Sequence, residues 1–94
     1  MKEWLLKEDL EALGFTFHAA NNITQKAKAY GIAEKHFMGK SKTKSHICSR
    51  RAINAKDLLA YYIRQIDGCE KRPTLKQYIG IWSKYKKILE EYLK

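Results

Sequence analysis

The spacing of hydrophobic residues predicts that the chain opens with a short helix over about Lys7–Leu13. Leu10 and Leu13 fall on one side of this helix, and acidic residues in its first turn suit the positive end of the helix dipole. Gly14 follows where a left-handed C-cap is expected, and Phe15 is the hydrophobic contact beyond that cap.

A second helix is predicted from about Phe17 to Tyr30, with Thr16 as its N-cap and Gly31 at its end. Its apolar face carries small and aliphatic residues at helical spacing: Ala19, Ala20, Ile23, Ala27 and Tyr30. Its polar face carries His18, Asn21, Asn22, Gln25 and Lys28, with Lys26 at the border. Two short helices joined by a tight turn indicate a helix-turn-helix.

The segment from Ile32 to Ile53 predicts a β-hairpin with a long loop, because two apolar patches flank a turn of Gly, Ser, Thr and Lys. The patches are Phe37–Met38 and Ile47–Cys48. Five cations lie within twelve residues at the tip and on the return strand: Lys40, Lys42, Lys44, Arg50 and Arg51. Lysines can guard a strand edge against aggregation, but this clustering favours an arm that lies along a phosphate backbone.

A third helix is expected after Asn54, which is a good N-cap, with Asp57 in the first turn. Its apolar stripe consists of Leu58, Leu59, Tyr62, Ile63 and Ile66. The polar stretch Asp67–Arg72 is expected to be a linker.

The last helix is predicted to open at Pro73, where Thr74 and Gln77 have the spacing of a capping box. Its apolar residues cover about half of the helical wheel, which exceeds the stripe of roughly 100° of a surface helix. Either the helix closes the core from two sides, or part of it docks a second subunit or another protein. The candidate docking residues are Tyr78, Ile81, Trp82, Tyr85, Ile88 and Tyr92.

The charge of the chain points to a polyanionic partner. Nineteen Lys and Arg residues against ten Asp and Glu residues give a formal net charge of +9 on 94 residues. Such an excess on one small domain favours nucleic acid, although a basic composition also serves solubility alone.

The N-terminal sequence MKEWLLKEDL is interrupted by charge and is not expected to be a signal peptide; Trp4 within it is expected to pack on the core. No apolar run approaches the roughly 20 residues that a membrane span needs. Cys48 and Cys69 fit neither a disulfide framework nor a zinc motif, and they are compatible with a reducing cytosol. We therefore expect a cytoplasmic protein that starts at Met1 and has no membrane partner.

The sequence lacks the constellations of an enzyme: it has no glycine-rich phosphate loop, no paired carboxylate site and no nucleophile with a credible base. His36, His46 and Cys48 are the nearest approach to a metal site, but a fourth ligand is missing and structural zinc requires four. We expect no cofactor, no metal and no catalysis.

The amides of the second helix are the most specific chemical signal. Asn and Gln are mediocre formers of an exposed helix face, but they can bond two atoms of an adenine edge in the major groove. An ordinary solvated face remains the alternative interpretation. We expect His18 to contact a phosphate or a base.

The stretches LLKEDLEALGF, HAANNITQKAK and SRRAINAKDLLAYY resemble the winged-helix domains of the excisionase and MerR-like group, and small proteins of Gram-positive mobile elements and phages. The resemblance covers about Trp4 to Tyr62. It implies an α+β, mostly helical fold with a winged helix-turn-helix over 1–72. The last helix, over 73–94, lies outside the resemblance and is expected as an addition within a single domain. It also implies that the second helix enters the major groove and that the hairpin lysines form the wing. The hairpin is longer and richer in lysine than a compact wing.

The sequence thus favours a small DNA-binding protein of a mobile element or phage that contacts duplex DNA as an excision factor or transcriptional regulator. The alternative is an accessory subunit of a mobile-element replication complex, which would hold single-stranded DNA on its basic surface. Its last helix would then dock on a polymerase or a similar partner. A phage-encoded inhibitor of a host enzyme fits the size but no particular residue.

Overall fold

The computed structural model describes residues 2–40 and 47–94, and the side chains of 2–36 and 51–94. In these residues the fold is α+β and mostly helical, which confirms the predicted class. The helices are α1 (Lys7–Leu13), α2 (Phe17–Lys26), α3 (Ala55–Cys69), the 3₁₀ helix η1 (Pro73–Tyr78) and α4 (Ile79–Tyr92); the strands are β1 (Trp4–Leu5), β2 (Glu34–Lys40) and β3 (Ile47–Asn54).

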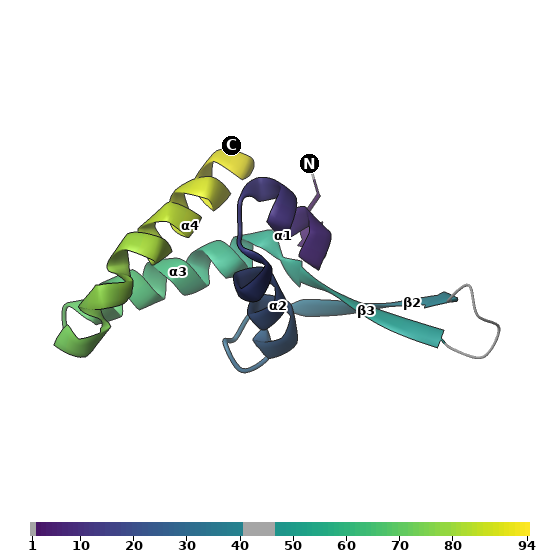
Figure 1. The fold of residues 1–94 in the computed structure, drawn as a ribbon, viewed down its shortest axis with the longest axis horizontal. Helices are drawn as coiled ribbons and strands as arrows, with labels where there is room; N and C mark the ends of the chain where they lie inside the picture. The colour runs from purple at the N-terminus through teal and green to yellow at the C-terminus, as the bar shows by residue number, and fades with distance from the viewer. Residues whose placement is uncertain (1, 41–46) are drawn as a thin grey trace.

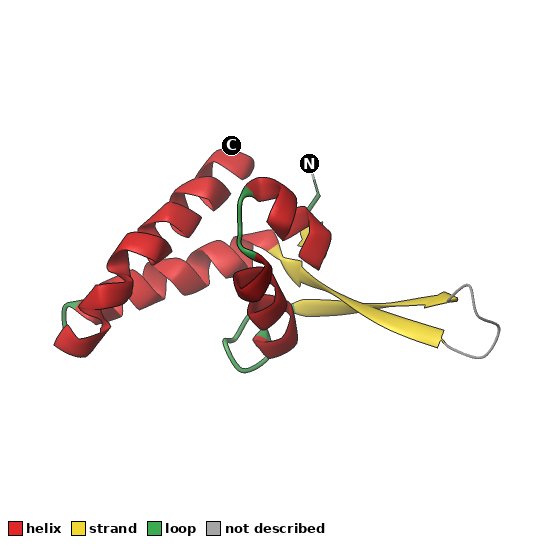
Figure 2. Ribbon diagram, in the orientation of Figure 1, coloured by secondary structure: helices red, strands yellow, loops and turns green. Residues whose placement is uncertain are grey.

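The three strands form one antiparallel sheet in the order β1-β3-β2 (Figure 2). Strands β2 and β3 are the predicted hairpin, with Glu34 opposite Ile53 at its base. Strand β1 was not expected from the sequence; it adds an edge to β3 by pairing Leu5 with Ile53. Its Leu5 is the residue that enters the core, whereas Trp4, expected there, is only half-buried beneath the Lys35 ammonium, 4.6 Å from its ring centroid.

The turn between α1 and α2 has the predicted chemistry. Gly14 caps α1 at φ 117°, and the Thr16 hydroxyl accepts a hydrogen bond of 3.1 Å from Ala19 N. Helix α2 ends at Lys26, however, and not at Tyr30 as predicted. The reason is a turn closed by Gly31, which has φ 74°, and by a hydrogen bond from Ile32 N to Ala27 O.

Helix α3 begins as predicted, because the Asn54 side chain accepts a hydrogen bond from Asp57 N at 3.0 Å. It then continues to Cys69, so the first half of the predicted linker Asp67–Arg72 is helical and that part of the prediction is wrong. The buried Cys69 explains this continuation: its Sγ contacts Gln65 O at 3.3 Å in the last turn and Leu75 O at 3.4 Å in η1.

The predicted capping box at the last helix is also wrong. The stretch from Pro73 to Tyr78 is a 3₁₀ helix that has no side-chain cap, and the α-helix starts only at Ile79. Proline fits the first turn because its missing N–H would have no partner there.

One hydrophobic core joins the helices to the base of the sheet. Phe15 stacks on Tyr85 of α4, with ring centroids 4.2 Å apart, and Leu89 of α4 is fully buried. Helix α4 therefore closes the core, which is one of the two roles predicted for it from the sequence. The buried cluster consists of Leu5, Leu10, Phe15, Ala20, Ile23, Ala27, Ile32, Ile53, Ala55, Leu58, Tyr62, Tyr85 and Leu89.

The molecule is elongated, 51 × 28 × 20 Å. Helices α3 and α4 lie side by side at one end, α1 and α2 occupy the middle, and the hairpin projects from the other end (Figure 1). The two ends of the chain meet, since Tyr92 Oη donates to Lys2 O at 2.8 Å and accepts from Lys2 N at 3.0 Å.

Candidate nucleic-acid interface

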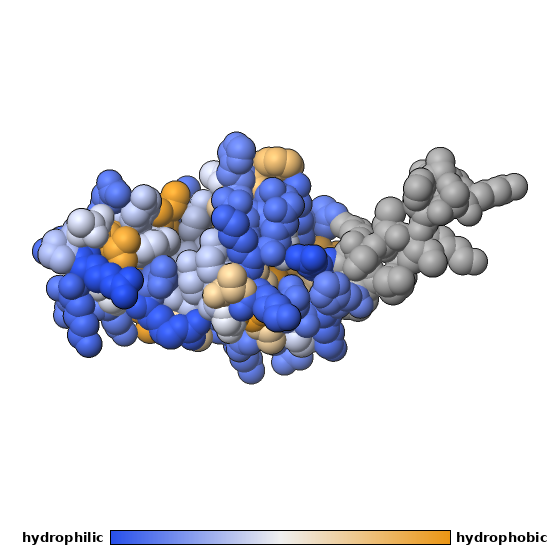
Figure 3. All heavy atoms as spheres, turned by 90° about the horizontal axis from the view of Figure 1, so that it is seen from below, coloured by the Kyte–Doolittle hydropathy of each residue, from blue (hydrophilic) through white to orange (hydrophobic). Residues whose placement is uncertain are grey.

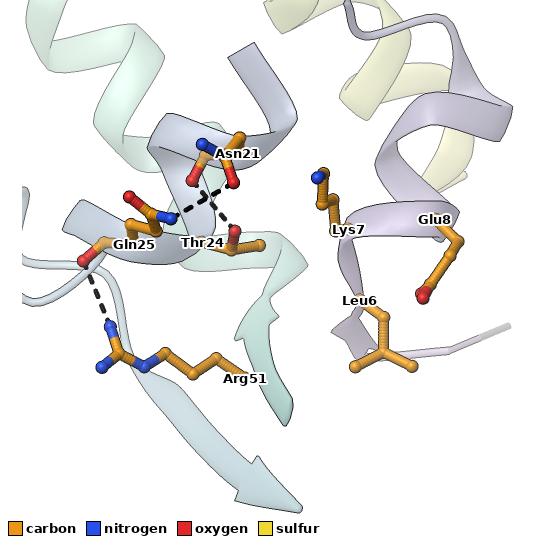
Figure 4. Close-up of a pocket in the computed structure, with 7 residues that line it drawn as sticks. All are labelled: Leu6, Lys7, Glu8, Asn21, Thr24, Gln25 and Arg51. Carbon is orange, nitrogen blue, oxygen red and sulfur yellow. Dashed lines mark hydrogen bonds between the residues drawn. The ribbon is translucent and has the colours of Figure 1, made fainter. Parts of the chain in front are cut away.

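An open hollow of about 650 Å³ lies where the start of α1, the exposed side of α2 and the base of β3 come together (Figure 4). We call it the three-element hollow. Its lining is mostly polar and includes two cations and one carboxylate. The lining residues are Leu6, Lys7, Glu8, Asn21, Thr24, Gln25 and Arg51.

Two of the predicted amides meet in this hollow. Gln25 Nε2 donates a hydrogen bond of 3.3 Å to Asn21 Oδ1, one helical turn away. The bond holds the Gln25 amide and does not use its oxygen or its second N–H, which are the groups that pair with an adenine edge. Thr24 beside them is buried and bonds to Ala20 O, so it belongs to the helix and not to the exposed surface.

Arg51 connects the hairpin to α2. Its Nη1 donates to Gln25 O at 3.3 Å, near the C-terminal end of the helix, where a cation suits the helix dipole (Figure 4). The guanidinium is exposed and has five N–H donors, of which this contact uses one. Arg51 therefore fixes the hairpin base against α2 and can still contact an anion.

Lys7 supplies the second cation from α1. Its ammonium lies 3.7 Å from the ring centroid of Phe17, at the start of α2. The position of Lys7 depends on the packing of α1 against α2, so its place in the hollow was not predicted from the sequence. The sequence feature that could have drawn attention to Lys7 is its place at the first residue of the predicted helix.

The remaining residues of the predicted polar face lie elsewhere. Asn22 lines a separate cleft beside Trp82 and Tyr61, on the side of α2 that faces α3 and α4. Lys28 lies beyond the end of α2 and lines another hollow, with Asp57. His18 and Lys26 are exposed. The structure thus brings together Asn21 and Gln25 but not all five predicted residues.

The predicted wing cations are only partly described. Lys42 and Lys44 lie outside the described residues, as do the side chains of Lys40 and Arg50. The backbone of Lys40 lies in β2 and that of Arg50 lies in β3, which are the two strands of the predicted hairpin.

The candidate docking residues of the last helix divide by burial. Tyr85 is 4% exposed and belongs to the core, while Trp82, Ile88 and Tyr92 pack against it. Tyr78 and Ile81 are each 44% exposed. Across the face seen in Figure 3, hydrophobic side chains appear as small separate patches in a mostly hydrophilic surface.

The metal constellation considered from the sequence cannot be assembled from the described residues. His36 lies 3.3 Å from Glu34, and His46 and the Cys48 side chain are outside the description. No group of three metal-ligating side chains occurs within residues 2–36 and 51–94. Over the same part of the chain, no helix is long and apolar enough to cross a membrane.

Comparisons of the chain with models of protein families, with curated proteins and with solved structures find no significant match.

Proposed function

We propose that this protein binds duplex DNA as a winged helix-turn-helix, with α2 in the major groove and the β2–β3 hairpin as the wing. The observation that carries the proposal is the convergence of Asn21 and Gln25 with Lys7 and Arg51 around the three-element hollow. Amides read base edges, and cations from two flanking elements can contact phosphates on either side of the groove.

The order of elements supports the same proposal. Two helices joined by a capped turn are followed by a hairpin and a further helix, and Arg51 holds the base of the hairpin against α2. The net charge of +9 provides the attraction for a polyanion. By its resemblance to excisionase-like proteins, the biological role would be that of an excision factor or transcriptional regulator of a mobile element or phage.

Selection from random duplex DNA, followed by binding measurements on the selected and scrambled duplexes, tests the proposal. Replacing Asn21 and Gln25 together by Ala should reduce the preference for the selected site by about tenfold to a hundredfold, because a bidentate amide–base pair contributes roughly 1–3 kcal/mol. Scrambled duplexes should bind about equally to both proteins.

Asn22→Ala is the matched control, since it removes a neighbouring amide that lies outside the hollow. It should keep the preference. A double variant that discriminates as well as the wild type would contradict the proposal. Tighter binding of single-stranded than of duplex oligonucleotides at the same salt would instead favour the replication accessory.

A further inference from the structure

Phe17, the first residue of α2, is 59% exposed, more than any other large hydrophobic residue among the described side chains. The core does not use its ring, because Phe15 two residues earlier fills the interior and is 4% exposed. The first helical position favours acidic residues or proline, so helix stability does not account for an aromatic residue there. The exposed part of the ring is therefore available to a ligand.

The ring lies in line with the amide pair. Phe17, Asn21 and Gln25 are spaced by four residues, so they form a row along one side of α2. Lys7 links the two ends of this row, since its ammonium covers one face of the ring and its side chain lines the three-element hollow with both amides.

The surroundings of the ring attract an anionic ligand. The first turn of α2 has no acidic residue, in contrast to that of α1, which has Glu8 and Asp9. The first turn of α2 thus supplies no acidic side chain of its own to the positive end of the helix dipole, and Lys7 adds a full charge 3.7 Å from the ring centroid. A ligand here should combine an apolar group for the ring with phosphates for the cation.

We propose that Phe17 packs against the 5-methyl group of a thymine in the major groove, near the base read by Asn21 and Gln25. This inference rests on the proposed function. Thymine is the one base of DNA that presents a methyl group in that groove, and Phe is suited to contact it. The four-residue step from Phe17 to Asn21 rises about 6 Å, which is roughly two base-pair steps of 3.4 Å, so the thymine should lie one or two base pairs from the base read by Asn21.

Deoxyuridine substitution tests the contact, because it removes the methyl group and leaves every hydrogen-bonding atom of the base. Each thymine of the selected duplex is replaced in turn, and binding is measured for the wild type and for Phe17→Ala. One position should weaken wild-type binding about fourfold, as expected for the loss of one buried methyl group. Phe17→Ala should bind the thymine duplex about fourfold more weakly or worse and be indifferent to deoxyuridine at that position.

Ile81→Ala is the control, since it truncates another exposed apolar residue on α4 and should remain sensitive to deoxyuridine. Equal sensitivity of Phe17→Ala and the wild type would overturn the methyl contact while leaving duplex binding intact. Insensitivity of the wild type at every position would overturn it as well. If no duplex is selected at all, the proposed function itself fails and the methyl contact fails with it.

Discussion

Gly14 and Gly80 should respond in opposite directions to alanine. Gly14 has φ 117°, which an L-residue adopts only with strain, so Gly14→Ala should lower the free energy of unfolding by about 1–2 kcal/mol. An added Cβ meets only Ile88 Cδ1 at 3.5 Å, so the backbone and not a clash causes the loss. Gly80→Ala lies within α4 in open space and should stabilise by about 0.5–1 kcal/mol. Urea denaturation of both variants checks the pair.

The carboxylate of Asp9 gives the start of α1 a dependence on pH. A hydrogen bond from the Lys2 ammonium at 2.8 Å, with another from Leu6 N at 2.9 Å, holds the pKa of Asp9 below its ordinary value, against the opposing effect of partial burial. A lowered pKa in the folded state means that this stabilisation is complete above the unfolded value of about 3.8 and is lost as pH falls through the folded value.

We therefore expect Asp9→Asn to destabilise the protein at pH 6 by at most about 1 kcal/mol, because an exposed ion pair contributes little. The difference from the wild type should shrink as the pH is lowered below about 3.8, where the wild-type carboxyl becomes protonated. Unfolding curves at a series of pH values measure it. A constant difference across the series would disprove the linkage.

Helices α1, α2 and α3 begin where the sequence predicts, whereas α2 and α3 end elsewhere and α4 begins later than predicted. Thr16, Asn54 and Gly14 are local signals, and each has the predicted role. The end of α3 was misjudged because it depends on a contact outside the helix: Cys69 holds the last turn of α3 against η1, and the hydrophobic spacing does not predict this contact. Strand β1 is two residues long and is defined by its pairing with β3, about fifty residues later. Such a short segment has no alternation of hydrophobic and polar residues from which a strand could be predicted.

Two threonines test this distinction between a cap that forms and one that does not. Thr16→Ala removes the oxygen that accepts from Ala19 N and should cost about 1 kcal/mol. Thr74→Ala removes no cap, because η1 has no side-chain hydrogen bond at its start, and should change stability by less than about 0.5 kcal/mol. Equal losses measured by thermal or urea denaturation would restore the predicted capping box.

At the scale of the molecule, the sequence predicted part of the site. The row on α2 follows from helical spacing, so Asn21 and Gln25 could be selected in advance. Arg51 was also selected, as a cation of the hairpin, but its contact with Gln25 O across 26 residues was not foreseen. Lys7 was not selected, because it reaches the hollow only through the packing of α1 on α2. Asn22 lies on the side of α2 that faces α3 and α4, apart from Asn21 and Gln25, and this separation depends on where α3 and α4 pack.

The last helix should be indispensable to the fold. Tyr85 and Leu89 are part of the core, and Tyr92 binds the other end of the chain through Lys2. Leu89→Ala should cost about 2–5 kcal/mol by leaving a cavity. A chain truncated before Pro73 should lose cooperative unfolding, as measured by circular dichroism. A truncated chain that unfolds cooperatively would show that residues 2–72 fold without this helix.

We propose that the three-element hollow, and not the overall positive charge, binds DNA. Duplex affinity measured against salt for Lys7→Ala/Arg51→Ala and for Lys84→Ala/Lys87→Ala, whose lysines are exposed on α4, tests this proposal. Both variants lose two charges. We predict that the first variant loses about two phosphate contacts, so the slope of log K against log salt falls in magnitude by roughly 1.8, while the second keeps the wild-type slope. Equal losses in the two variants would contradict the claim.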